Sequence, residues 1–121
     1  MAKILNSKVK NIPWQDKPAN CTDPVWRYTE NPIIDRSFVK DANSIFNSAV
    51  VRRDKEDDFA GVFRLDDITR EQYLVTGFSK DGIHWKLNDE KIFRGYDPRL
   101  CEIDGKYYLS WVCHTDRGTS I

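Results

Sequence analysis

The chain has 121 residues, with 19 basic and 19 acidic side chains, so its formal net charge is zero. A chain without net charge has no general field that attracts nucleic acid or an anionic membrane, and we expect neither as a partner. Hydrophobic residues make up 40% of the chain, which is enough for a small core and excludes a disordered tail. No run approaches the roughly 18 apolar residues of a membrane span, and no apolar leader opens the sequence, so we expect a cytoplasmic protein.

The cysteines and histidines predict neither a disulfide framework nor a metal site. Cys21, Cys101 and Cys113 are odd in number and far apart, without a Cys-x-x-Cys pair. His84 and His114 stand at no ligand spacing from a cysteine. We therefore expect buried or idle thiols and no metal.

The first 44 residues are predicted to form an extended segment that packs on the rest of the chain. Four of the five prolines lie in the first 32 residues, and proline disfavours both helix and central strand. Trp14, Trp26 and Tyr28 make this segment too apolar for a free tail.

Residues 45–90 predict one unit of four strands. A charged exposed loop over 52–58, a turn at Asp66-Asp67 and a hairpin at Asp81-Gly82 separate the apolar runs. No window has a helical period, so the predicted class is all-β. The expected strands are Ile45 to Val51, Phe59 to Leu65, Gln72 to Phe78 and Ile83 to Leu87.

A similar pattern returns later in the chain. The run from Phe46 to Val51 resembles Tyr96 to Cys101 at an offset of 50, and Phe59 to Phe63 resembles Tyr107 to Trp111 at an offset of 48. Four-stranded units repeating at about this period are typical of β-propeller blades. Residues 45–90 would form the first blade and 91–121 the start of a second. Two repeats also fit a coincidence between aromatic-rich hairpins.

One and a half blades would leave strand edges unpaired. A propeller needs at least four blades to close, and open edges pair with other chains. We therefore expect either the beginning of a larger protein or a homo-oligomer.

The repeat aligns Asn47 with Asp97, and both would face one axial pocket. Aromatic walls disfavour the charged form of an aspartate, which suits Asp97 to act as a general acid. A neighbouring Arg99 would oppose that shift. An equally supported interpretation is that Asp97 caps a turn before Pro98.

Arg64 is followed by Asp66, and the pair could hold sugar hydroxyls or an anion through directed hydrogen bonds. A solvated turn with a surface ion pair is the more common outcome for such a cluster. The Asp81-Gly82 turn is interpreted as structural, with Trp85 packing between blades. No nucleotide-binding, nucleophile-elbow or zinc-protease motif is present.

Several motifs in series resemble glycoside hydrolase family 130, the β-mannoside phosphorylases and related β-mannosidases. These enzymes are five-bladed β-propellers. The N-terminal motifs Ile12-Pro13-Trp14, Lys17-Pro18-Ala19 and Trp26-Arg27 resemble the branch acting on mannosyl-glucose, mannosyl-N-acetylglucosamine or manno-oligosaccharides. The other motifs are Asn31-Pro32-Ile33-Ile34, Asn43 to Val50, Phe59 to Arg64 with Asp66-Asp67, Gly77 to Trp85 and Tyr96-Asp97-Pro98-Arg99.

The resemblance implies a role for each matching residue. Asp97 would be the catalytic proton donor to the glycosidic oxygen, in some members by way of a mannose hydroxyl. The expected substrate-binding residues are Asn47, Ser48, Arg64 and Asp66 around the mannose, with Tyr96 and Arg99 flanking the acid.

The implied reaction is a glycosyltransferase-type phosphorolysis. Inorganic phosphate, a co-substrate rather than a cofactor, would attack a β-mannoside with inversion and give α-mannose 1-phosphate. No other cofactor is implied, and the partners would be a β-mannoside oligosaccharide and phosphate.

Two departures from the family pattern leave alternatives open. Only ten residues separate Trp85 from Tyr96, where family members carry a longer loop. The family's phosphate-binding basic residues and most acceptor-sugar contacts have no counterpart in this chain. A β-mannosidase that uses water, and a non-catalytic truncated propeller that at most binds mannosides, therefore remain as alternatives, and the acceptor sugar is undetermined.

Overall fold

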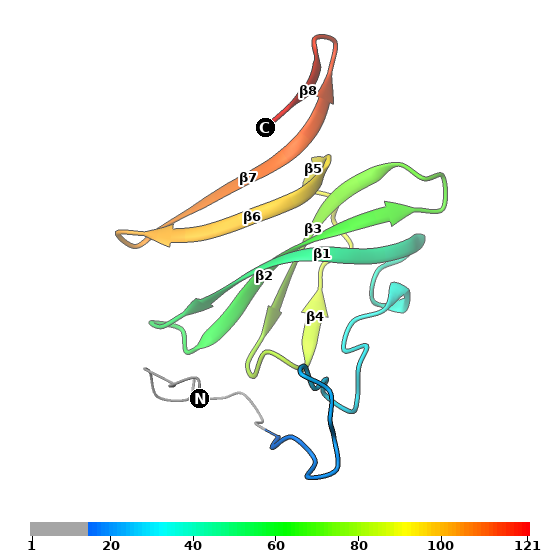
Figure 1. Cartoon of the computed structure of the whole chain (residues 1–121). Helices are drawn as coiled ribbons and strands as arrows, with labels where there is room; N and C mark the ends of the chain where they lie inside the picture. Colours follow the sequence, from blue (N-terminus) through cyan, green and yellow to red (C-terminus); the bar gives the residue numbers. More distant parts are fainter. Residues whose placement is uncertain (1–14) are drawn as a thin grey trace.

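The computed structural model describes residues 15–121, which form antiparallel β-strands and one short 3-10 helix (Figure 1). The predicted all-β class is confirmed. The motif Ile12-Pro13-Trp14 and the expected packing of Trp14 lie outside the described residues. Within the described range, no helix is long and apolar enough to cross a membrane. The elements are η1 (Arg36–Phe38), β1 (Ala42–Arg53), β2 (Asp58–Asp67), β3 (Gln72–Ser79), β4 (Trp85–Leu87), β5 (Phe93–Arg94), β6 (Tyr96–Ile103), β7 (Lys106–Thr115) and β8 (Gly118–Ser120).

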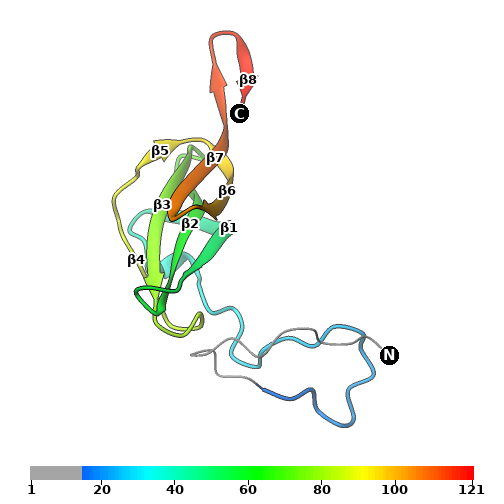
Figure 2. The same ribbon diagram turned by 90° about the vertical axis from the view of Figure 1, so that its left-hand side faces the viewer.

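The strands form two antiparallel sheets. The first has the order β1-β2-β3-β4, with β5 also paired to β3, and the second has the order β6-β7-β8. Strand β6 contacts β1, β2 and β3, so the hairpin β6–β7 lies across one face of the first sheet while β8 projects beyond it (Figures 1 and 2).

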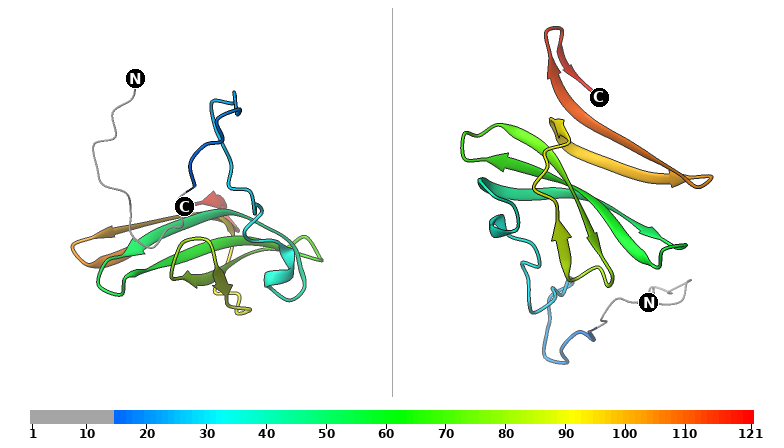
Figure 3. Two further views of the ribbon diagram at one scale, coloured as in Figure 1. Left: turned by 90° about the horizontal axis from the view of Figure 1, so that it is seen from below. Right: turned by 180° about the vertical axis from the view of Figure 1, so that it is seen from behind.

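The other face of the first sheet carries the hydrophobic core. Side chains alternate across a strand, so Phe63 and Leu65 of β2 share this face with Val75 of β3. Leu65 and Val75 are fully buried. Val39, next to η1, and Ile34 pack on the same cluster. Residues 15–30 extend away from the strands and are mostly exposed, whereas residues 31–34 lie against β1 (Figure 3).

The repeat seen in the sequence is a repeat of structure. Phe46 pairs with Arg64, and Tyr96 pairs with Val112, which keeps the offset of 48 between the second strands. Each first strand has a register shift just after its aromatic residue. The match between the two hairpins is therefore no coincidence of composition.

The turn predicted at Asp66-Asp67 lies two residues further along the chain, because both aspartates belong to β2. The chain turns at Ile68 and Thr69. The carboxylate of Asp67 accepts hydrogen bonds from the backbone N–H and the hydroxyl of Thr69, at 2.9 and 2.7 Å. It also forms an ion pair with Lys91, with 2.9 Å between the charged atoms. The aspartate thus holds the turn from the strand end, as Asx turns do.

The hairpin predicted at Asp81-Gly82 is confirmed, because β3 pairs antiparallel with β4 around it. Its loop is longer than a two-residue turn, and β4 begins at Trp85 instead of Ile83. Asp81 Oδ1 accepts from the backbone N–H groups of Ile83 and His84 at 2.9 and 2.8 Å. Burial would raise the pKa of Asp81, but these bonds and the contact with His84 lower it well below the usual range. Trp85 packs edge-on against Phe63, on the face opposite β6, and so does not lie between the two described sheets.

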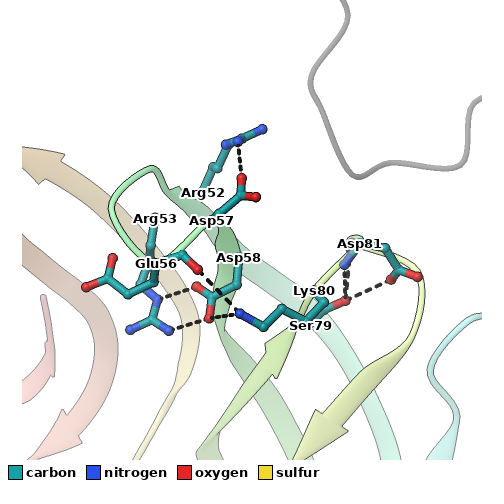
Figure 4. A network of polar contacts seen from close by, with 9 residues as sticks. Arg52, Arg53, Glu56, Asp57, Asp58, Ser79, Lys80 and Asp81 are labelled. Carbon is teal, nitrogen blue, oxygen red and sulfur yellow. Dashed lines mark hydrogen bonds and ion pairs between the residues drawn. The ribbon is translucent and has the colours of Figure 1, made fainter.

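The charged run over 52–58 is only in part the exposed loop that was predicted. Arg53 ends β1 and Asp58 begins β2, and they form a two-pronged ion pair at 2.7 Å for each hydrogen bond (Figure 4). Lys80 reaches the same carboxylate at 3.7 Å. The hydrogen bond from Arg53 lowers the pKa of Asp58, against the effect of burial.

The short strand β5 was missed in the sequence, and it leads directly into the second sheet. Phe93 stacks on Trp111 with 4.5 Å between ring centroids. Gly95 follows at φ +138° and donates its N–H to Gln72 at 2.9 Å. A Cβ on Gly95 would lie 2.4 Å from the carbonyl oxygen of Val112.

We predict that Gly95→Ala destabilises the chain by about 2–4 kcal/mol, because it combines a strained φ with a backbone clash. Gly118→Ala is the matched control, since Gly118 has φ +110° but open space around the added Cβ. The control should cost only about 1–2 kcal/mol. Chemical denaturation measures both, and equal losses would contradict the packing described at Gly95.

Candidate functional site

Two equivalent β-bulges bring Asn47 and Asp97 together. Both residues have left-handed backbone angles, φ 45° and 53°, in the register shifts after Phe46 and Tyr96. A bulge of this kind turns a side chain out of the normal alternation of the strand. Asn47 Nδ2 donates to Asp97 Oδ1 at 2.6 Å, so the bond joins the first strands of the two repeated hairpins.

Arg64 connects Asp97 to a second carboxylate. Its Nε and Nη2 donate to the two oxygens of Asp66 at 2.8 and 3.2 Å, and its Nη1 donates to Asp97 Oδ1 at 3.3 Å. The side chains of Arg64 and Asp66 are only 14% and 17% exposed. The alternative of a solvated turn with a surface ion pair is therefore wrong.

The pKa of Asp97 is lowered, whereas the aromatic surroundings predicted that it would be raised. The hydrogen bond from Asn47 is the largest cause, and the bond and charge of Arg64 add to it. Burial acts in the opposite direction, but the carboxylate is 35% exposed and desolvation is incomplete. Arg99, the arginine expected to oppose the shift, makes the smallest contribution of these groups.

Aromatic rings line the same cluster. The guanidinium carbon of Arg64 lies 5.2 Å from the ring centroid of Tyr96 and 4.3 Å from that of Phe46. The ring of His114 lies 5.5 Å from that of Tyr96. Phe46 and His114 were missed as site residues. The repeat itself could have indicated Phe46, because it precedes Asn47 as Tyr96 precedes Asp97.

Two predicted site residues form no hydrogen bond with the side chains of this cluster. Ser48 is exposed and lines a groove of about 300 Å³ that is also lined by the segment 31–34. Arg99 is exposed, and its Nη1 donates to the backbone oxygens of Pro98 at 2.9 Å and Asp97 at 3.4 Å.

The arrangement leaves one oxygen of Asp97 available. Both side-chain donors bind Oδ1, and among the described residues Oδ2 accepts no hydrogen bond. A partly exposed carboxyl oxygen beside an arginine, an amide and aromatic rings can exchange a proton with a bound hydroxyl or glycosidic oxygen. Nowhere in residues 15–121 do three His, Cys, Asp or Glu side chains gather as a metal ion would require.

We predict that Asn47→Ala raises the pKa of Asp97 toward the usual value for an aspartate, because it removes the largest stabiliser of the carboxylate. Arg99→Ala, the control, removes only the smallest and should change this pKa less. A carbon-13 NMR titration of the Asp97 carboxyl group measures both. An equal or larger change in the Arg99 variant would contradict the assigned order.

Comparison with known proteins assigns the chain to a family. Residues 6–121 match the model of glycoside hydrolase family 130, described as beta-1,4-mannooligosaccharide phosphorylase. A curated relative, the beta-1,4-mannooligosaccharide phosphorylase of Ruminococcus albus, is 48% identical over 126 residues. This alignment covers 90% of the chain but 38% of the relative. At 126 residues it is longer than the whole chain of 121, so the relative has residues in this region without a counterpart here. The chain thus belongs to glycoside hydrolase family 130.

Proposed function

We propose that the chain is part of an inverting β-1,4-mannooligosaccharide phosphorylase and that its sheets belong to a five-bladed propeller. Family membership and the name of the Ruminococcus albus relative support the reaction class. The repeated hairpin with equivalent bulges supports the propeller. The observation that carries the proposal is Asp97, held through Oδ1 by Asn47 and Arg64 with Oδ2 left for a substrate.

In the proposed reaction, an oxygen of inorganic phosphate attacks the anomeric carbon of the terminal β-mannosyl unit. The bond from that carbon to the glycosidic oxygen breaks, and the leaving oxygen receives the proton of Asp97, directly or through a mannose hydroxyl. Attack on the opposite face inverts the configuration and gives α-mannose 1-phosphate. Because phosphate is already a competent nucleophile, the reaction needs no second carboxylate to activate water, unlike inverting hydrolysis.

Proton donation requires the protonated form of Asp97, yet its surroundings in the free chain favour the carboxylate. Substrate binding would reverse this preference in two ways. A sugar covering the exposed third of the side chain would desolvate the carboxylate, and a nearby phosphate anion would add a like charge. Both effects raise the pKa, so we propose that Asp97 takes up its proton only in the loaded site.

The remaining site residues are proposed to bind the mannose. Asn47 and the Arg64–Asp66 pair offer donors and acceptors suited to sugar hydroxyls beside Asp97, and Tyr96 offers a ring face. Ser48 would reach the sugar from the neighbouring groove. The exposed guanidinium of Arg99 would have to leave the backbone oxygens that it binds here.

The proposal requires more protein than these residues. The chain spans 38% of the length of the curated relative, so phosphate and acceptor contacts would come from a longer polypeptide or from further copies. The mass of the chain in solution distinguishes a monomer from a homo-oligomer. A cytoplasmic location and the lack of nucleic-acid or membrane partners stay predictions.

We predict that the protein, incubated with a β-1,4-mannooligosaccharide, releases mannose 1-phosphate only when phosphate is present. Asp97→Asn should lower the rate by about 10²–10⁴-fold, because the proton donor is lost while the shape is kept. Chromatography of the products with and without phosphate, on the chain and on any longer form, is the measurement.

The alternatives give different outcomes. Free mannose released without phosphate would indicate a β-mannosidase, and mannoside binding without turnover in any form would indicate a non-catalytic propeller. An unchanged rate in the Asp97→Asn variant would contradict the assignment of Asp97 as the proton donor.

A further inference from the structure

Phe46 is a partly exposed aromatic residue beside the candidate site. The residue is 38% exposed, although a large aromatic side chain stabilises a fold most when it is buried. Its neighbour across the strands is Arg64, and the ring centroid lies 4.3 Å from the guanidinium carbon. This distance is well within the range of a cation–π contact.

The equivalent residue of the second hairpin contacts the same arginine. Tyr96 has Val112 as its neighbour across the strands, and therefore no arginine of its own. Its ring centroid instead lies 5.2 Å from the guanidinium carbon of Arg64. The two aromatic residues that precede the bulges thus both contact the guanidinium group of Arg64.

The bonds of Arg64 differ in how firmly they are held. Nε and Nη2 form the two-pronged pair with Asp66, whereas Asp97 receives one longer contact of 3.3 Å from Nη1. Aromatic faces restrict the planar guanidinium and shield it from water, which strengthens its hydrogen bonds. The contact most sensitive to loss of a ring is therefore the one to Asp97.

We propose that Phe46 is a positioning residue of this site, which with Tyr96 fixes the guanidinium plane of Arg64 so that Nη1 stays on Asp97. Phe46 would act through Arg64, its neighbour across the strands, rather than on the substrate. The significance of the inference for catalysis rests on the proposed function, but the contact between Phe46 and Arg64 does not.

The test is an NMR study of the chain with Phe46→Leu, which keeps apolar volume but removes the ring face. We expect the Nη1 protons of Arg64, which face Asp97, to exchange with water faster and the pKa of Asp97 to rise, because a weakened Nη1 contact stabilises the carboxylate less. Phe46→Tyr should restore both values. Neither readout requires turnover, so failure of the proposed function leaves this test intact.

Phe78→Leu is the matched control. Phe78 is 44% exposed, and its ring centroid lies 5.0 Å from the guanidinium carbon of Arg53 in the remote ion pair with Asp58. Its loss should leave Arg64 and Asp97 unchanged. Unchanged Arg64 exchange and Asp97 pKa in a folded Phe46→Leu chain would overturn the proposal.

A second measurement needs no variant. In the unmodified chain, the ring currents of Phe46 and Tyr96 should shift the side-chain proton resonances of Arg64 upfield relative to those of Arg99, with Phe46, the nearer ring, contributing more. Resonances of Arg64 like those of an exposed arginine would equally overturn the proposal.

Discussion

The hydrogen bond between Asn47 and Asp97 is the interaction on which the candidate site depends. It joins the first strands of two hairpins that are 50 residues apart in the sequence but equivalent in structure. Each partner stands in a bulge that directs its side chain out of the strand alternation. The left-handed backbone suits both residues, since asparagine and aspartate tolerate it better than most side chains.

Arg64 then sets the charge balance of the site. One guanidinium serves two carboxylates and lies near two aromatic rings, one from each hairpin. Since Asp66 takes two of its nitrogens, only one is left for Asp97. The Nη1 contact adds to the hydrogen bond from Asn47, the largest cause, in lowering the pKa of Asp97, and both donors bind Oδ1, which leaves Oδ2 for a bound ligand.

Internal repetition made much of this site predictable from sequence. The equivalence of Asn47 and Asp97 follows from the aromatic residue before each and from the matching second strands. The repeat placed Asn47 beside Asp97, but the lowered pKa of Asp97 was not predicted, because its largest cause is a hydrogen bond between side chains 50 residues apart and its next lowering cause comes from Arg64, 33 residues away. From the sequence, the neighbouring Arg99 was expected to be the arginine that lowers the pKa of Asp97.

Local turn chemistry was predicted less well. Asp67 looks like a turn residue, but its side chain holds the turn from the end of β2. Strand β5 has two residues, too few for any periodicity, and its pairing with β3 is long-range. The enzyme class was predicted from several family motifs in the family's order, and the match to the family model supports that prediction.

The most direct test of this account is a double-mutant cycle on Asn47 and Asp97. The free energies of unfolding of the chain, Asn47→Ala, Asp97→Ala and the double variant would be measured by chemical denaturation. The account predicts a coupling of about 1 kcal/mol, because a hydrogen bond to a partly exposed carboxylate is lost only once in the double variant. Additive effects, within about 0.3 kcal/mol, would contradict the claim that this bond joins the two hairpins.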